Sequence, residues 1–175
     1  MKNINDLAGI LLDIGCGAHK RQNFVGMDIR PLPNVDIVHD INRHPWPIDD
    51  EAVLTAVASH LVEHIPPVAI GPDGTWFPFV AFMDEVWRIL KPNGQLALSL
   101  PHGYSPGFLQ DPTHCNACNE ATWAYFDPEH MLWHIYKPKP WKIESYYGTV
   151  IGNMEVLLRK RTMAELDELL AGGDG

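Results

Sequence analysis

A short apolar run that ends in a glycine turn limits the fold of this chain more than any other feature. The run covers residues 8–14, and the segment Asp13-Ile-Gly-Cys-Gly17 closes it. A continuous apolar run of this length is typical of a strand that is buried on both faces of a parallel sheet. Glycines directly after such a strand let the backbone approach a ligand at the carboxyl edge of the sheet, where open α/β sheets bind their ligands. The segment therefore predicts an α/β fold with a binding site at this edge.

The remaining segments extend the same pattern along the chain. Residues 76–90 carry apolar side chains at three- and four-residue spacing and end at Lys91-Pro-Asn-Gly94, which predicts an amphipathic helix. Further short apolar stretches lie at residues 24–29, 35–39, 53–58, 95–100, 141–147 and 150–158. The last two are separated by Gly148 and predict a closing hairpin, and a tail helix is expected over 162–175. The sequence thus predicts a three-layer α/β fold whose mostly parallel sheet ends in an antiparallel C-terminal hairpin.

The composition narrows the class of protein. With 175 residues the chain fits a single domain, residues 1–175, and its 46% hydrophobic and 20% charged residues are ordinary for a globular protein. No apolar run approaches the ~18 residues that a membrane-spanning helix needs. Residues 1–6 lack the pattern of a signal peptide, so we expect a cytoplasmic protein. Three cysteines in such a protein are expected to be thiols and not a disulfide framework.

The net charge of -9 is distributed unevenly. Residues 44–136 hold eleven acidic residues and two basic ones, Arg88 and Lys91. Binding of nucleic acid needs clusters of Lys and Arg that face the phosphates, so nucleic acid is not the expected partner. Residues 137–161 hold six basic and two acidic residues, and this basic C-terminal patch is a candidate docking face for an acidic protein partner.

Acidic residues follow the second and third expected strands. Asp28 at the end of the second strand can accept hydrogen bonds from two ribose hydroxyls, and Asp40 after the third can contact an adenine amine or ring. A dinucleotide would need a full helix after the glycine turn and an acid about twenty residues further on. Gly17 and Asp28 are only eleven positions apart, which leaves residues 18–23 for the first crossover and no room for that helix. An adenosine ligand without a phosphate fits this spacing better.

After the first apolar run come seven segments that resemble, in order, the successive motifs of small class I S-adenosylmethionine-dependent methyltransferases, similar to the type 11 methyltransferases. They are Asp13-Ile-Gly-Cys-Gly17, Val25-Gly-Met-Asp28, Asp36-Ile-Val-His-Asp40, Pro45-Trp-Pro-Ile-Asp49, Ser59-His-Leu-Val-Glu-His64, Arg88-Ile-Leu-Lys-Pro-Asn-Gly94 and Leu100-Pro-His102. The resemblance covers residues 8–102. It implies a Rossmann-like fold that binds S-adenosylmethionine at the ends of its first four strands and transfers the sulfonium methyl group.

The resemblance also implies roles for individual residues. Gly15 and Gly17 would lie against the methionine part of the cofactor. Asp28 would hold the ribose, and Asp40 with Ile41 would contact the adenine. The full set of expected cofactor-binding residues is Asp13, Gly15, Cys16, Gly17, Asp28, Ile29, Asp40, Ile41, Ser59 and His60.

Two departures from the family pattern lie in the first crossover. His19 stands where the family has a small residue, and residues 18–23 are too few for the usual crossover helix, so we expect that helix to be shortened or missing. Either the loop is compact and irregular, or the affinity for the cofactor is reduced. We expect the compact loop, because Asp28 keeps its place at the end of the strand.

Histidines follow the fourth and fifth strands, where the methyl group would be presented. An in-line methyl transfer needs an aligned acceptor, and it needs a base when the acceptor arrives protonated. His60 is the first candidate for this role, and His102 leaves the fifth strand into the same cleft. Asp111 and His114 are further candidates, because their segment resembles the substrate side of these methyltransferases and belongs to an expected substrate-side lid over 102–140. A histidine at a strand end equally fits a structural role, such as pairing with a carboxylate.

Two sequence patterns suggest a metal, and neither leads us to expect one. His60-Leu-Val-Glu-His64 matches the H-x-x-E-H pattern of inverted zinc peptidases, but Pro66 and Pro67 end that helix after little more than a turn. His114-Cys-Asn-Ala-Cys118 could form a zinc site with His102 or His130. Without a second C-x-x-C motif, Cys115 and Cys118 are expected to be thiols that line a pocket.

The sequence therefore predicts S-adenosylmethionine-dependent methyl transfer to a small-molecule or modest polar acceptor. The segment Ser59-His-Leu-Val replaces the Asn/Asp-Pro-Pro-aromatic signature of amino-methyltransferases, which argues against methylation of the exocyclic amine of a base. The short first crossover leaves a second hypothesis open, a non-catalytic accessory module of the same fold that binds the cofactor or a protein partner.

Overall fold

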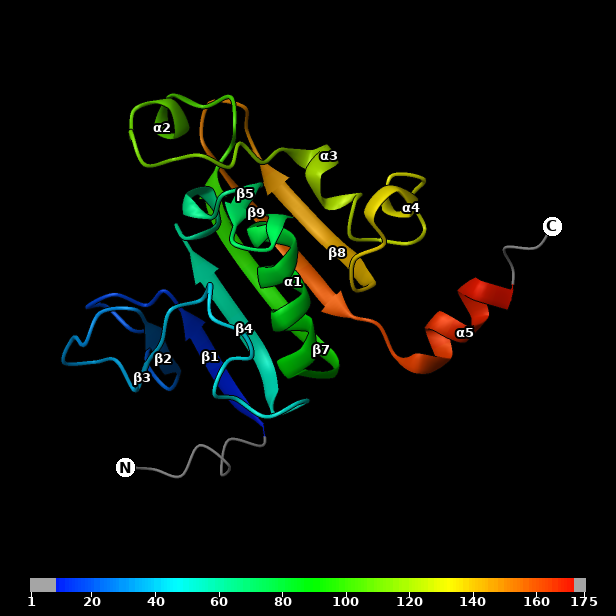
Figure 1. Ribbon diagram of the computed structural model, residues 1–175, viewed down its shortest axis with the longest axis horizontal. Coiled ribbons are helices and arrows are strands. Elements are labelled where there is room, and N and C mark those ends of the chain that lie inside the picture. Colours follow the sequence, from blue (N-terminus) through cyan, green and yellow to red (C-terminus); the bar gives the residue numbers. More distant parts are fainter. Residues whose placement is uncertain (1–8, 172–175) are drawn as a thin grey trace.

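A seven-stranded sheet forms the centre of the fold (Figure 1). The structure is a computed structural model that describes residues 9–171. The strands follow the order β3-β2-β1-β4-β7-β9-β8. Their bounds are β1 Ile10–Ile14, β2 Val25–Asp28, β3 Ile37–Val38, β4 Val53–Ser59, β7 Leu90–Pro101, β8 Trp141–Gly148 and β9 Asn153–Lys160. The neighbouring strands β3, β2, β1, β4 and β7 are parallel, and β9 is antiparallel to β7 and β8. The expected mostly parallel sheet with an antiparallel C-terminal hairpin is therefore confirmed.

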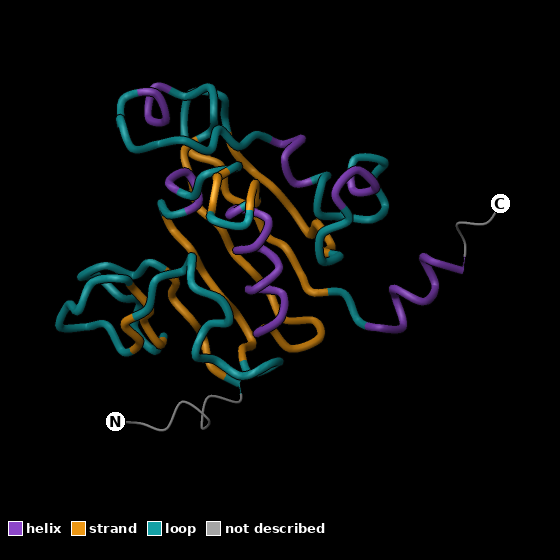
Figure 2. Tube along the Cα trace, viewed as in Figure 1, coloured by secondary structure: helices purple, strands orange, loops and turns teal. Residues whose placement is uncertain are grey.

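One long helix, α1 (Pro78–Ile89), connects β4 to β7 and packs against the sheet (Figure 2). The smaller elements are the 3-10 helix η2 Val62–His64, the hairpin β5 Ala69–Gly71 and β6 Gly74–Trp76, and the helices α2 Pro106–Leu109, α3 Glu120–Trp123, α4 Trp133–Tyr136 and α5 Met163–Ala171. No helix in the described part of the chain is long and apolar enough to cross a bilayer. The last residues of the expected tail helix, 172–175, and the segment 1–6 that carried the signal-peptide argument lie outside the described residues.

Hydrophobic spacing explains how α1 and β7 pack together. Leu96, Leu98 and Leu100 are buried while the residues between them are partly exposed, which is the period-two pattern of a strand. Phe82 and Val86 of α1 are buried at the spacing of one helix face. Each such fully buried side chain contributes roughly 1.5–3 kcal/mol of hydrophobic stabilisation. The sheet and α1 thus form the core from which the loops at the carboxyl edge project.

The first crossover contains no helix among residues 15–24, as the sequence predicts (Figure 2). The backbone N–H of Arg21 donates to Asp13 Oδ2 at 2.8 Å, which ties the loop back to β1. On β2, a Cβ added to Gly26 would lie 2.7 Å from Cys16 Sγ, so the absence of a side chain lets the loop pack directly on the strand. The loop is therefore compact and irregular.

The buried carboxylate of Glu85 joins α1 to the loop that precedes β4. It accepts hydrogen bonds from the backbone N–H of Trp46 at 2.6 Å and from the Arg88 guanidinium at 2.6 and 3.1 Å. Burial alone would raise the pKa of Glu85, but hydrogen bonds from His44, Arg88 and Trp46 outweigh burial and lower the pKa from 4.5 to about 2. Glu85 therefore stabilises the fold only while it is ionised.

This pKa predicts a specific loss of stability in acid. A carboxyl group with a lowered pKa stabilises the folded state above its unfolded pKa, and the contribution is lost as the pH falls toward the folded value. Between pH 4.5 and about pH 2, the unfolding free energy of the wild type should fall by about 3 kcal/mol more than that of Glu85→Gln. Urea denaturation of both proteins across this range measures the difference, and a difference that does not vary with pH contradicts the prediction.

Residues 102–140, the expected lid, connect β7 to β8 and contain α2, α3 and α4. Figure 1 shows α2 at the end of the sheet toward which β4 and β7 point. Gly103 closes this segment on itself, because its backbone N–H donates to the Cys118 carbonyl at 2.7 Å. A Cβ on Gly103 would lie 2.8 Å from the carbonyl carbon of Ala117, which is closer than real Cβ contacts come.

Gly103→Ala should therefore lower the free energy of unfolding by about 1–3 kcal/mol, the usual cost of forcing extra volume against fixed atoms. Gly107→Ala is the matched control, because the nearest heavy atom to its Cβ would be Ser105 Oγ at 3.6 Å. The control should change stability by no more than about 0.5 kcal/mol. Chemical denaturation compares the two variants, and equal effects would show that the contact between Gly103 and Ala117 is not tight.

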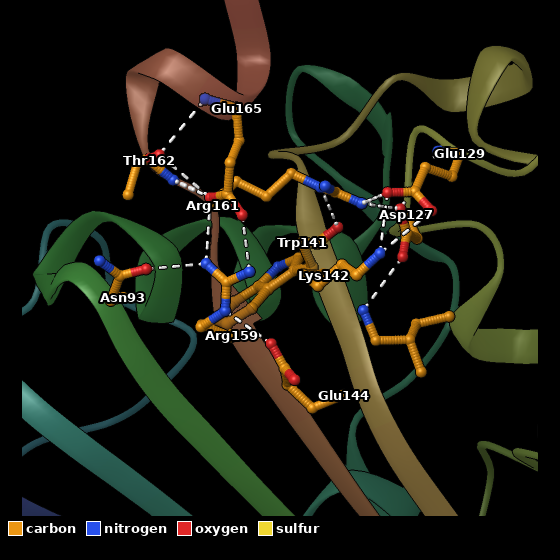
Figure 3. Close-up of polar contacts among 11 residues, drawn as sticks. Asn93, Asp127, Glu129, Trp141, Lys142, Glu144, Arg159, Arg161, Thr162 and Glu165 are labelled. Carbon is orange, nitrogen blue, oxygen red and sulfur yellow. Dashed lines mark hydrogen bonds and ion pairs between the residues drawn. The ribbon is translucent and has the colours of Figure 1, made fainter. Parts of the chain in front are cut away.

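An ion-pair network joins the lid to the C-terminal hairpin (Figure 3). The buried Arg161 guanidinium pairs with Asp127 and, at 2.9 Å, with Glu129, and it also donates to the Trp141 carbonyl at 3.0 Å. The second oxygen of Asp127 accepts the backbone N–H of Ile143 at 3.0 Å. This network fixes the end of the lid against the edge strand β8.

The basic C-terminal patch is largely neutralised within the fold. Four of its six basic residues make ion pairs with acidic residues elsewhere in the chain: Lys142, Arg159, Lys160 and Arg161. Figure 3 shows Arg159 between Glu144 of β8 and Glu165 of α5. These charges hold the hairpin, the lid and α5 together, so docking of an acidic partner on this patch stays a prediction.

Candidate functional site

The carboxyl ends of β1, β2 and β4 meet at one edge of the sheet. Ile14 pairs with Met27 on one side and with Ala58 on the other, so the turns after these strands are neighbours. Gly15 and Gly17 have φ values of +68° and +56°. Glycine adopts this left-handed conformation without the steric cost that a side chain incurs, which explains both glycines of the turn.

Asp28 lies directly beside the glycine turn. Its Oδ2 accepts the backbone N–H of Gly17 at 2.9 Å, and its Oδ1 accepts the backbone N–H of Arg30 at 2.9 Å and the Arg30 Nε at 3.2 Å. Burial alone would raise the pKa of Asp28, but the hydrogen bonds from Arg30 and Gly17 outweigh it and lower the pKa. The carboxylate is therefore a buried anion at the end of β2.

The position of the Arg30 side chain bears on ligand binding. A Cβ on Gly17 would lie 3.5 Å from Arg30 Nη2, so the guanidinium lies over the glycine turn as well as beside Asp28. The Arg30 side chain is mostly exposed and its pair with Asp28 is a surface contact of low energy. The Asp28 carboxylate can therefore exchange the Arg30 guanidinium for another hydrogen-bond donor while the bond from Gly17 remains.

The other residues expected at this edge have different surroundings. Asp13 is buried and holds the first crossover through Arg21. Burial, with the anionic Asp13 and Asp28 nearby, raises the pKa of the Cys16 thiol to about 11, so Cys16 remains a thiol. Ile29 is exposed beyond β2, and Ser59 is partly buried at the end of β4.

The turn after β3 contains Asp40 and Ile41, the two residues expected to contact an adenine. Asp40 Oδ1 accepts the backbone N–H of Asn42 at 3.0 Å and its side-chain amide at 3.2 Å. Ile41 is partly buried, and its carbonyl accepts the Trp46 indole N–H at 3.0 Å. The backbone N–H of His39 donates to the Asp28 carbonyl at 3.0 Å and places this turn next to β2, so the glycine turn, Asp28 and Asp40 follow three adjacent strands.

His60 begins the turn after β4 in a left-handed conformation, with φ +51°. Its Nδ1 donates to Glu63 Oε1 at 3.1 Å, and its Nε2 accepts the Asn153 side-chain amide at 3.3 Å. Leu61 packs over the glycine turn, because a Cβ on Gly15 would lie 3.0 Å from Leu61 Cδ1. His60 is half exposed and is therefore accessible beside the turn expected to hold the methionine part of the cofactor.

His114 and Asp111 come to the same turn from the lid. The Nε2 of His114 lies 4.0 Å from Glu63 Oε1 and 3.8 Å from Asp111 Oδ2. The rings of His64 and His114 are 4.7 Å apart in an edge arrangement. The structure thus places His60 and His114 beside Glu63, with Asp111 next to His114, although their catalytic role stays a prediction.

His102, the fourth, makes different contacts. It is buried, its Nε2 lies 3.2 Å from Glu120 Oε2, and its Nδ1 accepts the backbone N–H of Tyr104 at 3.2 Å. This is the pairing with a carboxylate that the sequence left open as a structural role. Asn153, which contacts His60, was not anticipated, because it lies 93 positions away and no motif marks it.

The cysteines of the lid do not resemble metal ligands. Cys115 is exposed, whereas Cys118 is buried. Burial, with the neighbouring Glu63, raises the pKa of the Cys118 thiol to about 12, so Cys118 is a thiol in this structure. Among the described residues, the group of potential ligands that does converge is Glu63, His64 and His114.

The chain resembles known proteins in its structure, whereas its sequence matches none of those compared. No model of a known family matches the sequence, and no curated protein sequence matches it. A S-adenosylmethionine-dependent methyltransferase from Archaeoglobus fulgidus matches with a TM-score of 0.58 at 15% identity, covering 87% of this chain and 86% of that one. A chain from the complex between the Haloferax volcanii Trm112 methyltransferase activator and a methyltransferase matches with a TM-score of 0.57 at 11% identity, covering 89% of this chain and 84% of that one.

The fold also occurs in a protein described by another reaction. The [4+2]-cyclase SpnF matches with a TM-score of 0.57 at 15% identity, covering 91% of this chain and 80% of that one. At such identities the likeness concerns the fold alone. The chain therefore has the Rossmann-like fold of the class I S-adenosylmethionine-dependent methyltransferases, as its sequence motifs implied.

Proposed function

We propose that the chain binds S-adenosylmethionine at the carboxyl ends of β1 to β4 and transfers its methyl group to a small-molecule or modest polar acceptor. The observation that carries this proposal is the bond between the Asp28 carboxylate and the Gly17 N–H. It joins an anion suited to ribose hydroxyls to a turn whose left-handed glycines leave room for a ligand. The methyltransferase fold supports the choice of ligand.

Different residues at this edge would contact different parts of the cofactor. Asp28 would hold the ribose, the turn at Gly15 and Gly17 would contact the methionine part, and Asp40 with Ile41 would contact the adenine. The first crossover offers no helix N-terminus for a pyrophosphate, which agrees with a ligand that has none. When bound, the cofactor supplies an electrophilic methyl group on a sulfonium sulfur.

His60 is the proposed base or positioning group on the acceptor side. Because its Nδ1 donates to Glu63, its Nε2 carries a lone pair that now accepts from Asn153. An acceptor hydroxyl can replace the Asn153 amide and give its proton to Nε2. Glu63 would orient the ring and balance the positive charge that forms on it.

A second candidate function is a non-catalytic accessory module of the same fold. The matched complex with a methyltransferase activator shows that a protein of this fold has a protein partner, and the matched cyclase shows that the fold does not fix the reaction. In that case the chain would bind the cofactor, or a partner, without transferring a methyl group.

Calorimetric titration with S-adenosylhomocysteine tests cofactor binding, and isotope-labelled S-adenosylmethionine with hydroxyl, thiol and amine acceptors tests the transfer. Saturable binding with label in a product supports the methyltransferase. If the cofactor binds but no acceptor yields a labelled product, and His60→Ala binds the cofactor as the wild type does, the accessory module is favoured. No binding at about millimolar ligand, the upper end of ordinary substrate affinities, overturns both cofactor-based functions.

A further inference from the structure

We infer that Glu63, His64 and His114 form a site for a divalent transition-metal ion, with Zn²⁺ as the natural probe. Their potential ligand atoms all lie within 4.8 Å of one another. Two imidazole nitrogens and one carboxylate are a donor set that zinc and related ions accept. The sequence led us to expect no metal, because Pro66 and Pro67 end the helix of the His60–His64 motif and no second C-x-x-C motif accompanies Cys115 and Cys118.

An unsatisfied buried oxygen supports the site independently of the spacing. Glu63 is fully buried, and its Oε2 has no hydrogen-bond partner in the structure. A buried carboxylate oxygen without a partner is costly, and native proteins satisfy such groups with a donor or an ion. A cation held by Glu63 would provide the missing partner.

The hydrogen bonds of His114 leave its Nε2 free for an ion. Its Nδ1 lies 3.0 Å from the Phe108 carbonyl, which only accepts, so Nδ1 carries the proton. The Nε2 then lies 4.0 Å from Glu63 Oε1, the oxygen that also accepts from His60, and 3.8 Å from Asp111 Oδ2. Both distances exceed a hydrogen bond, so the Nε2 of His114 makes no hydrogen bond to either oxygen.

His64 is oriented in the same way by a relay through Thr113. The Thr113 hydroxyl donates to Asp111 Oδ1 at 2.7 Å, so its oxygen accepts from His64 Nδ1 at 3.0 Å. The proton on Nδ1 leaves the Nε2 of His64 as the metal-binding nitrogen. An Nδ1–H bonded to a carbonyl or to a carboxylate relay is the usual outer-shell support of a metal-ligating histidine.

The backbone brings the three ligands together. The N–H groups of Cys115 and Asn116 both donate to the Glu63 carbonyl, at 2.8 and 3.1 Å, and so hold the lid against η2. Ligands of a tetrahedral zinc ion lie about 3.4 Å apart, so ligand atoms that lie up to 4.8 Å apart must approach one another by up to about 1.4 Å. His64 is exposed and can move by that amount. Three protein ligands leave one position for water or an oxygen of a bound molecule.

Zinc binding is measured without cofactor, by competition with a chromogenic chelator, so it is independent of the proposed methyl transfer. We expect one Zn²⁺ per chain. His64→Ala and His114→Ala should lower the affinity by more than the roughly 10–100-fold typical of losing an outer-shell partner, and Thr113→Val by about 10-fold. Because His64 is exposed, its variant should keep the stability of the wild type.

His130→Ala and Cys118→Ser separate this site from the cysteine site that the sequence suggested. Neither residue belongs to the proposed cluster, so both variants should bind zinc as the wild type does. Loss of binding in Cys118→Ser with full binding in His64→Ala would overturn the proposal in favour of a cysteine site. The proposal is also overturned if the wild type binds no Zn²⁺, or if His64→Ala and His130→Ala bind it equally.

Discussion

Replacing Asp28 with alanine should weaken binding of S-adenosylhomocysteine by about 100-fold or more. Two hydrogen bonds from ribose hydroxyls to a carboxylate are each worth roughly 1.5–3 kcal/mol, and a factor of ten in affinity corresponds to about 1.4 kcal/mol. The pKa of Asp28 is lowered by Arg30 and Gly17, so the carboxylate is ionised at neutral pH and is a strong acceptor. Calorimetry on the wild type and the variant measures the change in affinity.

Arg30→Ala is the control that distinguishes ligand binding from support of the loop. Its guanidinium contacts the same carboxylate but is mostly exposed, and a ribose would displace it. This variant should bind S-adenosylhomocysteine as tightly as the wild type or more tightly. If Asp28→Ala keeps its fold by circular dichroism and binds with wild-type affinity, Asp28 does not hold the ribose.

Asp127→Ala should be the most destabilising substitution in the ion-pair network, by about 3–5 kcal/mol. Asp127 and Arg161 are each only 3% exposed, so removing the carboxylate leaves a buried guanidinium without its main partner. The change also removes the acceptor of the Ile143 N–H, which joins the lid to β8. Urea denaturation measures the loss in free energy of unfolding.

Glu129→Gln provides the comparison at an exposed position. Glu129 is 44% exposed and pairs with Arg161 at 2.9 Å and Lys142 at 2.8 Å. Exposed pairs contribute about 0–1 kcal/mol, so this variant should lie close to the wild type. A loss in Asp127→Ala no larger than that in Glu129→Gln would mean that burial does not set the strength of this network.

The strand positions could be predicted because each depends on local sequence. The apolar run before Gly15 and the alternation in β7 fix which residues face the core, and the short step from Gly17 to Asp28 excludes a crossover helix. The bounds differ most for β7, which was expected over 95–100 and is found over Leu90–Pro101, so that it includes the Lys91-Pro-Asn-Gly94 segment expected to end the helix. They also differ for β3, which was expected over 35–39 and is found over Ile37–Val38. Its register depends on pairing with β2, which local spacing does not encode.

The partners of charged and histidine side chains could not be predicted, because they come from distant segments. The basic run at 137–161 reads as a docking patch in the sequence, but the fold supplies acids such as Glu51 and Asp127 to it. Likewise, His102 pairs with Glu120, which lies eighteen positions further along the chain. Only the packing of the lid decides which histidines meet.

A crystal structure of the protein grown with S-adenosylhomocysteine tests the central claim most directly. The account predicts ribose hydroxyls within hydrogen-bond distance of Asp28, with the Arg30 guanidinium moved away and the Gly17 N–H still bonded to the carboxylate. Adenosine density elsewhere, or an Asp28 that keeps its bonds to Arg30 beside a bound ligand, would contradict it.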